Sequence, residues 1–256
     1  MATVKIRFIA NSSVLIDVGD RRLLIDGLYG NNPFFTPIRK EMKKAVFGMN
    51  SEYRDIDYLI FTHRHTDHFD AAYINEYVRN NNVKAVFATP ASIDPSAYLE
   101  DRRRLDECEK RNILHEISFD TENSVSFDLT DKIILTYYNM DHLDKNTYPI
   151  PNAGVKIEID GRQLFFAGDA DYSNDNARMF EQLQALDCIF ITPLFLQHSA
   201  GRAIINKINP KRIVIYHLPD ESYDNTSVLS ICKRALEFEY VCPVDVFDKE
   251  GKTIEF

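Results

Sequence analysis

Cysteine and long apolar runs are both scarce in this sequence of 256 residues. The four cysteines are scattered without a C-x-x-C pair, which is typical of reduced thiols and not of zinc knuckles or of a secreted disulfide framework. No stretch approaches the roughly 18 uninterrupted apolar residues that a membrane-spanning helix needs. The first residues lack a basic region followed by a long apolar run, so we expect no signal peptide. The sequence therefore predicts a cytoplasmic protein that does not enter a membrane.

Positive charge is also in deficit. Lysine and arginine total 30 against 39 acidic residues, which gives a formal net charge of −9. Because lysine and arginine dominate binding to a phosphate backbone, a nucleic-acid partner is not expected. A small, anionic substrate remains compatible with this balance. The one arginine patch, residues 102–104, has acidic neighbours, and we interpret it as part of a solvated helix, an insertion around residues 95–112.

The order of apolar segments predicts an α/β fold. The 45% hydrophobic content is enough for one domain over residues 1–256. Short runs rich in valine, isoleucine, leucine and aromatics predict strands, and amphipathic runs predict helices. Both halves proceed from strands to helix and strand, so we expect two sheets packed face to face with helices outside. The expected strands are 5–10, 13–18, 21–27, 56–61, 83–90, 124–129, 132–139, 155–160, 162–169, 188–195, 212–218, 244–248 and 252–256. The expected helices are 70–80, 96–112, 176–187, 202–209 and 226–240.

The segment FTHRHTDHFD gathers four potential metal ligands directly after an apolar strand. Alternate side chains of an extended segment point to one side, so His63 and His65 can converge on one cation. If the chain turns at Thr66 into the next helix, Asp67 and His68 reach a second point nearby. The alternative is a surface turn with Asp67 as a helix cap. Four such residues together favour the metal site.

Three more candidate ligands stand at the ends of other expected strands. They are His142, Asp169 and His217, each after a run of β-branched or aromatic residues. Loops at strand ends can meet at one edge of a sheet and commonly carry function. Each residue alone would be interpreted as a hydrogen-bonded strand terminus. Together with the histidine cluster they predict a shared site.

This pattern resembles the metallo-β-lactamase superfamily, through the H-x-H-x-D-H motif, a distant histidine, a strand-Gly-Asp turn and a last histidine. The resemblance implies a four-layer αβ/βα sandwich. It also implies that His63, His65 and His142 hold one metal, that Asp67, His68 and His217 hold a second, and that Asp169 bridges them. The opening strands and residues 154–172 resemble the branch that includes ascorbate-6-phosphate lactonase. Asp26 is similar to an early aspartate of the family that supports the histidine loop, or it is a turn residue.

The expected chemistry is hydrolysis of a small ester, lactone or phosphoester. Two cations roughly 3.5–4 Å apart can share a water and lower its pKa toward about 7, so a metal-bridged hydroxide would be the nucleophile. Asp67 and Asp169 are the candidates to receive or return a proton. The cofactors expected are two divalent ions, zinc first, with manganese or iron as alternatives. No Gly-x-Ser-x-Gly motif points to a serine nucleophile.

Alternative functions on the same fold stay open. They are a phosphodiesterase or nuclease, a di-iron redox centre and a non-catalytic metal-binding module. The acidic charge argues against a large nucleic-acid substrate, and the histidine at position 65 stands where di-iron relatives usually have glutamate. An intact ligand set argues against a module without catalysis. The sequence makes no prediction of oligomeric state or of substrate identity, because one fold hosts many chemistries.

Several residues near the site remain ambiguous. The long irregular segment 28–50 carries Tyr29, Phe34, Phe35 and Phe47, which form either a wall of the substrate pocket or a satellite apolar cluster. His198 is a candidate catalytic residue, with a loop position of no function as the alternative. Between the ligands, Arg64 should point away from the metals by alternation and form a surface ion pair. His115 is interpreted as structural.

Overall fold

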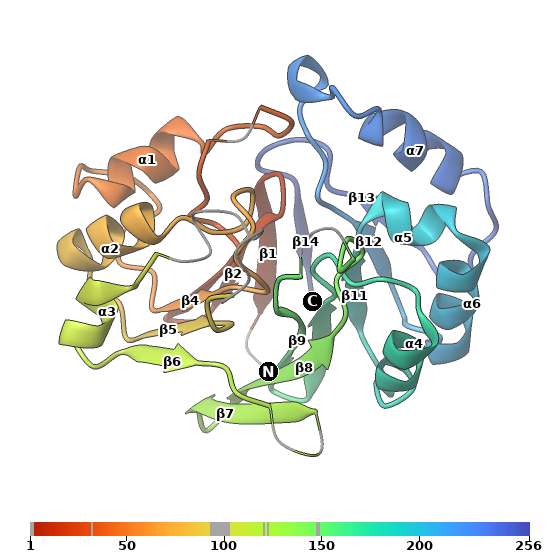
Figure 1. Ribbon diagram of the computed structural model, residues 1–256, viewed down its shortest axis with the longest axis horizontal. Helices are drawn as coiled ribbons and strands as arrows, with labels where there is room; N and C mark the ends of the chain where they lie inside the picture. The colour runs from red at the N-terminus through yellow and green to blue at the C-terminus, as the bar shows by residue number, and fades with distance from the viewer. Residues whose placement is uncertain (1–2, 32, 93–102, 120, 122, 147–148) are drawn as a thin grey trace.

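The computed structural model describes residues 3–31, 33–92, 103–119, 121, 123–146 and 149–256, arranged as two seven-stranded sheets with helices on their outer faces (Figure 1). The first sheet has the order β14-β1-β2-β3-β4-β5-β6, and the second has the order β13-β12-β11-β10-β9-β8-β7. Helices α1, α2 and α3 cover the first sheet, and α4 to α7 cover the second. This is the expected order of layers.

The strands of the first sheet are β1 (Val4–Ala10), β2 (Ser13–Val18), β3 (Arg21–Ile25), β4 (Tyr58–Ile60), β5 (Ala85–Ala88), β6 (Leu114–Glu116) and β14 (Thr253–Glu255). Those of the second are β7 (Ser124–Thr130), β8 (Ile133–Met140), β9 (Asn152–Ile159), β10 (Arg162–Phe166), β11 (Cys188–Ile191), β12 (Ile213–Ile215) and β13 (Val244–Val246). The helices are α1 (Lys40–Val46), α2 (Ala71–Asn80), α3 (Asp106–Lys110), α4 (Asn174–Phe180), α5 (Pro193–Gln197), α6 (Ser199–Ile208) and α7 (Val228–Ala235), with a 3₁₀ turn at Glu221–Tyr223.

Each sheet changes from antiparallel to parallel pairing part of the way across. Strands β1, β2 and β3 pair antiparallel, and β3 to β6 continue in parallel. In the second sheet, β7 to β10 pair antiparallel and β10 to β13 in parallel. Strands β8, β10 and β12 therefore run in one direction, and their carboxyl ends lie at one edge of the sheet. The residues that follow these ends can meet there.

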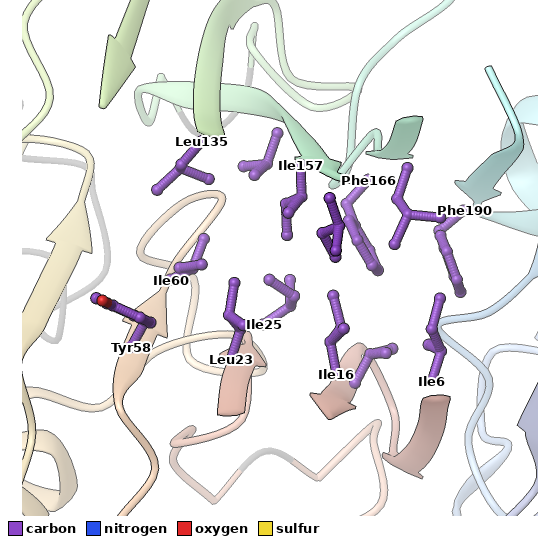
Figure 2. Packing of buried hydrophobic residues seen from close by; sticks show 14 of the residues in the cluster. Ile6, Ile16, Leu23, Ile25, Tyr58, Ile60, Leu135, Ile157, Phe166 and Phe190 are labelled. Carbon is purple, nitrogen blue, oxygen red and sulfur yellow. The ribbon is translucent and has the colours of Figure 1, made fainter. Parts of the chain in front are cut away.

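The two sheets enclose an apolar core made by alternate residues of their strands (Figure 2). Ile16 and Ile25 face this layer from the first sheet, and Phe166 and Phe190 face it from the second. The rings of Phe166 and Phe190 stack at 4.2 Å between centroids. Two further cores lie under the outer helices. Burial on both faces explains why many strands are apolar without interruption.

Several expected elements need correction. The segment 28–50, expected to be irregular, contains α1, and α6 begins at Ser199 instead of Arg202. Residues 188–195 were expected as one strand, but α5 begins at Pro193 because the Thr192 hydroxyl accepts from the Phe195 amide at 3.3 Å and proline suits the first helical position. Helix α4 ends at Phe180, not at Asp187, and the segment beyond it contains Ala185 at φ 58°, which is not helical. Helix α7 begins at Val228, two residues beyond the expected start.

The expected insertion helix is described only in part. Residues 93–102, which include Arg102, lie outside the described residues. Beyond them, Arg103 and Arg104 are not helical, and α3 spans only Asp106–Lys110. Arg104 is paired with Glu109 at 2.7 Å, so the expected neutralisation by acidic neighbours is present. In the part of the chain that the structure describes, no helix combines the length and apolarity needed to cross a membrane.

Candidate metal centre

The histidine motif leaves β4 in an extended conformation and then turns. Amides of His68 and Phe69 donate to the His65 carbonyl, both at 2.9 Å, and this closes the turn. Helix α2 begins afterwards, and its cap is Asp70, whose carboxylate accepts from the Tyr73 amide at 3.0 Å. The alternative in which Asp67 caps the helix is therefore wrong. The Asp67 side chain stays available to the site.

All seven candidate ligands lie together at the edge where the strands end. Their ligand atoms form two groups, within each of which the atoms lie no more than 4.8 Å apart. The first group is His63, His65, His142 and Asp169, and the second is Asp67, His68 and His217. The histidines and Asp67 are buried, and Asp169 is 20% exposed at its side chain.

Asp169 lies between the two groups. Its Oδ2 atom is 3.6 Å from His142 Nε2 and 3.9 Å from His63 Nε2. Its Oδ1 atom is 3.6 Å from His68 Nε2 and 3.5 Å from His217 Nε2. One carboxylate oxygen faces each group, so Asp169 is placed where it could contact an ion in either group. The preceding Gly168 has φ +58°, and a Cβ there would lie 3.0 Å from both Asn152 Oδ1 and Thr62 Cβ, so glycine permits this close approach.

Hydrogen bonds to Asp26 and Thr62, on the side away from the other ligands, orient the rings of His63 and His68. Asp26 accepts from the Thr62 amide and hydroxyl, each at 2.8 Å, and its Oδ2 atom is 3.0 Å from His68 Nδ1. A carboxylate only accepts, so this contact puts the His68 proton on Nδ1 and leaves Nε2 for a metal. The Thr62 oxygen, 3.0 Å from His63 Nδ1, has the same effect on that ring. Of the two readings of Asp26, support of the histidine loop matches these contacts.

His142 differs from the other two rings. Its Nδ1 atom accepts from the Asp144 amide at 2.9 Å, which favours the tautomer with the proton on Nε2. The Nε2 proton would have to leave before this atom could bind a metal.

Burial and mutual contacts move the pKa values of the site in opposite directions. Desolvation lowers the pKa of His63 well below its usual value and that of His65 to about 4. Desolvation acts the same way on His68 and His217, but Asp169 and Asp67 outweigh it and raise both pKa values. For Asp169, burial alone would raise the pKa, and His217 and His68 instead hold it well below the usual value.

Buried atoms at the centre fit divalent cations. His63 Nε2, His142 Nε2 and Asp169 Oδ1 are buried, and none has a hydrogen-bond partner among the described residues. Unsatisfied buried polar atoms are costly and rare in folded proteins. A cation that prefers imidazole nitrogen and carboxylate oxygen would satisfy all three. The donor set therefore suits zinc, manganese or iron.

A cavity of about 120 Å³ opens beside the candidate ligands of both groups. Its lining includes His142, Asp169 and His217, and the other lining residues are Phe35, Leu143, Asp144, Thr192, Pro193, Leu194 and Val228. Sequence reasoning missed most of these walls. The signal for Thr192 to Leu194 was their position after β11, the same strand-end position that pointed to Asp169. Leu143 and Asp144 follow a candidate ligand directly.

The aromatic segment contributes to both of its expected roles. Phe35 lines the cavity, and its ring meets His217 edge-on at 5.0 Å between centroids. Tyr29 is buried in the apolar cluster beneath α1 and α2, where its hydroxyl donates to the Thr36 carbonyl at 3.0 Å. Phe34 and Phe47 are about half exposed. One residue of the four therefore forms pocket wall and one belongs to the satellite cluster.

Arg64 points away from the ligands, as alternation predicts, but it is not at the surface. Its side chain is 2% exposed and donates to the Thr89 carbonyl at 2.6 Å and to Glu116 at 3.2 Å. The expected ion pair is present, with the arginine buried in the protein. Its role is to hold β5 and β6 against the histidine loop.

Neither His198 nor His115 belongs to the two groups of candidate ligands. His198 is exposed and stacks on Tyr172 at 4.0 Å between centroids, and it does not line the cavity. A catalytic role for His198 stays a prediction. His115 stacks on Phe87 at 4.7 Å, which agrees with a structural role.

A family described as beta-lactamase superfamily domain matches residues 21–220. The chain belongs to this superfamily. Among curated members of similar sequence is a UPF0173 metal-dependent hydrolase of Staphylococcus aureus (strain JH9), which is 21% identical over 175 residues, 67% of this chain and 66% of that protein. The chain thus matches slightly less than two thirds of the length of these relatives.

Solved structures confirm the metallo-β-lactamase fold of this superfamily member. Igni18, described as a novel metallo hydrolase from Ignicoccus hospitalis, aligns with a TM-score of 0.63 and 16% identity over 99% of this chain and 98% of that chain. The metallo-β-lactamase fold protein YhfI from Bacillus subtilis aligns with a TM-score of 0.62 and 16% identity over the whole of both chains. At these identities the likeness concerns the fold alone.

Proposed function

We propose that this protein is a hydrolase that uses two divalent metal ions, with zinc as the first choice and manganese or iron as alternatives. His63, His65 and His142 would hold one ion, Asp67, His68 and His217 the other, and Asp169 would bridge them. The observation that carries the proposal is the position of Asp169, with one carboxylate oxygen facing each group. The relatives named as metal-dependent hydrolases support it.

The reaction is the addition of water across an ester, lactone or phosphoester bond. The hydroxyl of water joins the acyl carbon or phosphorus, the bond to the leaving oxygen breaks, and the remaining proton passes to that oxygen. When bound, two divalent ions would lower the pKa of water and polarise the substrate oxygen. The lowered pKa values of Asp67 and Asp169 keep both carboxylates ionised at neutral pH, as metal ligands need to be. The two carboxylates remain the candidates to receive or return a proton.

The finer assignments follow from the sequence and stay proposals. The substrate is a small molecule, and the protein is cytoplasmic. Residues 1–256 act as one domain, because the ligands come from loops of both sheets. The resemblance to the ascorbate-6-phosphate lactonase branch supports a lactone or ester. A phosphodiesterase and a non-catalytic metal-binding module remain the alternatives that the experiment must separate.

The test combines metal analysis with a substrate panel. Protein purified without chelator should contain close to two divalent ions per chain, and it should hydrolyse at least one ester, lactone or phosphodiester. Asp169→Asn should lose at least one ion and reduce kcat by a factor on the order of 100 or more. The matched control is Asp175→Asn, at a side chain that is 77% exposed and paired only with Arg178 among the described residues. His198→Gln, measured beside them, tests the remaining catalytic candidate.

The alternatives predict different results. Hydrolysis restricted to phosphodiesters would favour the phosphodiesterase. A protein that is loaded with metal but inactive on the whole panel would favour the binding module. Full metal content in Asp169→Asn would contradict the bridging role.

A further inference from the structure

The cavity beside the metal centre has predominantly apolar walls. Phe35 stands on one side, Leu143 follows His142, and Pro193, Leu194 and Val228 come from the starts of α5 and α7. Candidate ligands form part of the same lining. A substrate whose scissile bond lies at the ligands must therefore place a neighbouring group against these walls.

The described lining residues include no lysine or arginine, and the two histidines among them are candidate metal ligands. Asp144 is the one acidic residue of the lining that is not a candidate ligand. The basic residues nearest in sequence are directed to other partners. Lys145 pairs with Asp141 and Asp171, and Arg39 forms two 3.0 Å hydrogen bonds with Asp220.

We propose that the substrate group held in this cavity is short, apolar and uncharged, and that Asp144 disfavours substrates with an anionic group at this position. The inference rests on the proposed hydrolase function and names its substrate class: a small neutral ester or lactone with an aliphatic acyl part. Water hydrolyses it to a carboxylic acid and an alcohol, with the hydroxyl added to the acyl carbon and the proton to the leaving oxygen. A substrate that carries a phosphate away from the scissile bond does not fit this class.

The size of the cavity limits the length of the group. An apolar cavity of about 150 Å³ can hold benzene, so the volume of about 120 Å³ here accommodates an aliphatic chain of roughly four or five carbons. Each methylene buried contributes about 0.8 kcal/mol, or nearly fourfold in binding. For a series of straight-chain esters, kcat/KM should rise severalfold per carbon and stop rising when the cavity is full.

The charge is tested with a matched pair of esters on the metal-loaded protein. The p-nitrophenyl ester of pentanoic acid is compared with the p-nitrophenyl monoester of succinic acid, which has nearly the same length and ends in a carboxylate. We expect kcat/KM to favour the pentanoate by about tenfold or more, since apolar walls leave a charge unsolvated and Asp144 repels it. Equal rates, or a preference for the succinate, would overturn the inference.

Two variants separate charge from shape. Asp144→Asn keeps the backbone amide that contacts His142 and removes the negative charge. The ratio of kcat/KM for the pentanoate to kcat/KM for the succinate should therefore fall by about fivefold. Leu194→Ala, at a side chain that is 37% exposed and hence safe to truncate, should move the optimum to a longer chain. Asp175→Asn is the control and should leave both properties unchanged. An unaltered preference in Asp144→Asn together with an unaltered optimum in Leu194→Ala would also overturn the inference.

Failure of the inference is distinguishable from failure of the proposed function. A protein that turns over the succinate monoester as well as the pentanoate is still a hydrolase, and only the assigned class is wrong. A metal-loaded protein that is inactive on every ester and phosphodiester tested contradicts the proposed function itself, and the inference with it.

Discussion

Asp26 is not a candidate ligand, but it supports His68 directly and His63 through Thr62. It is fully buried, adopts φ 47°, accepts twice from Thr62 and contacts His68. Asp26→Asn retains a residue type that tolerates positive φ but removes the carboxylate that fixes the His68 proton. We expect metal affinity to fall by about 10- to 100-fold, measured by competition with a chromophoric chelator. Asp17→Asn, a partly exposed acid paired with Arg7 and Arg22, is the control. Unchanged affinity in Asp26→Asn would contradict the supporting role.

Metal binding should depend on pH more strongly in the group with Asp67, His68 and His217 than in the group with His63 and His65. The raised pKa values of His68 and His217, whose Nε2 atoms lie 2.8 Å apart, mean that this pair retains a shared proton in the metal-free protein, whereas His65, with a pKa of about 4, is neutral. Metal binding to the half with Asp67 should therefore release protons and strengthen as pH rises, while the His63 half should respond less. Titration calorimetry in two buffers of different ionisation enthalpy, from about pH 6 to about pH 9, counts the protons. Equal proton release at both steps would be the contrary result.

At the residue scale, the side of the chain on which each ligand lies was predictable, because side chains alternate along an extended segment. Alternation along an extended segment puts His63 and His65 on one side and Arg64 on the other. The burial of Arg64 could not be predicted in the same way, because it depends on Thr89 and Glu116, which come from other parts of the chain. The proton position on His142 depends likewise on the turn that follows it.

At the scale of elements, the segment before α1 is tied to the loop after β12. Arg39 binds Asp220 through two 3.0 Å hydrogen bonds, and the Asp220 amide donates to the Thr36 hydroxyl at 2.7 Å. Asn225 donates to the Pro33 carbonyl at 2.9 Å. These contacts join the first half of the chain to the second and hold Phe35 against His217. We call this set of contacts the Arg39 clasp.

Loss of the Arg39 clasp should affect substrate binding more than chemistry. For Arg39→Gln we expect KM to rise by about three- to tenfold with a smaller change in kcat, because the Phe35 wall loses its support while the ligands stay in place. Asp220→Asn should behave alike, and the double variant should be little worse than either single variant, since both remove one interaction. Steady-state kinetics on the preferred ester provides the measurement. Additive losses would show that the two residues act independently.

The most predictable feature at this scale was that each ligand follows a strand. Five runs of apolar residues terminate at the positions from which Asp26, the histidine motif, His142, Asp169 and His217 project. Helix boundaries that depend on one capping side chain were not predicted. The start of α5 is an example. There, the Thr192 cap and Pro193 end an apolar run that periodicity alone reads as a longer strand.

At the scale of the whole molecule, the metal ions should stabilise the contact between the two sheets. The first sheet supplies the histidine motif after β4, and the second supplies ligands after β8, β10 and β12. Removing the ions with a chelator should lower the melting temperature by about 10 °C, because ligands at about 1,000 times their Kd contribute about 4 kcal/mol and a protein of this size shifts by about 2–4 °C per kcal/mol. Differential scanning calorimetry measures the change. Asp169→Asn should respond less to chelator, and an equal response would argue against ions shared between the sheets.

The two-layer arrangement of sheets was predictable for a general reason. Uninterrupted apolar strands have to be buried on both faces, and the sequence repeats its strand-to-helix order in each half. The cavity was not predictable, because its walls combine Phe35, Leu143, Leu194 and Val228 from four separate segments of the chain. Their approach depends on the packing of the complete molecule.

The edge-on contact of Phe35 with His217 makes position 35 suitable for a fluorescent reporter of the metal centre. The chain contains no tryptophan, so a Phe35→Trp substitution would install a single indole fluorophore next to a candidate ligand, 5.0 Å away between ring centroids in the parent side chains. Its emission would report solely on this corner of the molecule. Filling of the site, entry of an ester and departure of the acid could then be followed in real time, without any extrinsic dye.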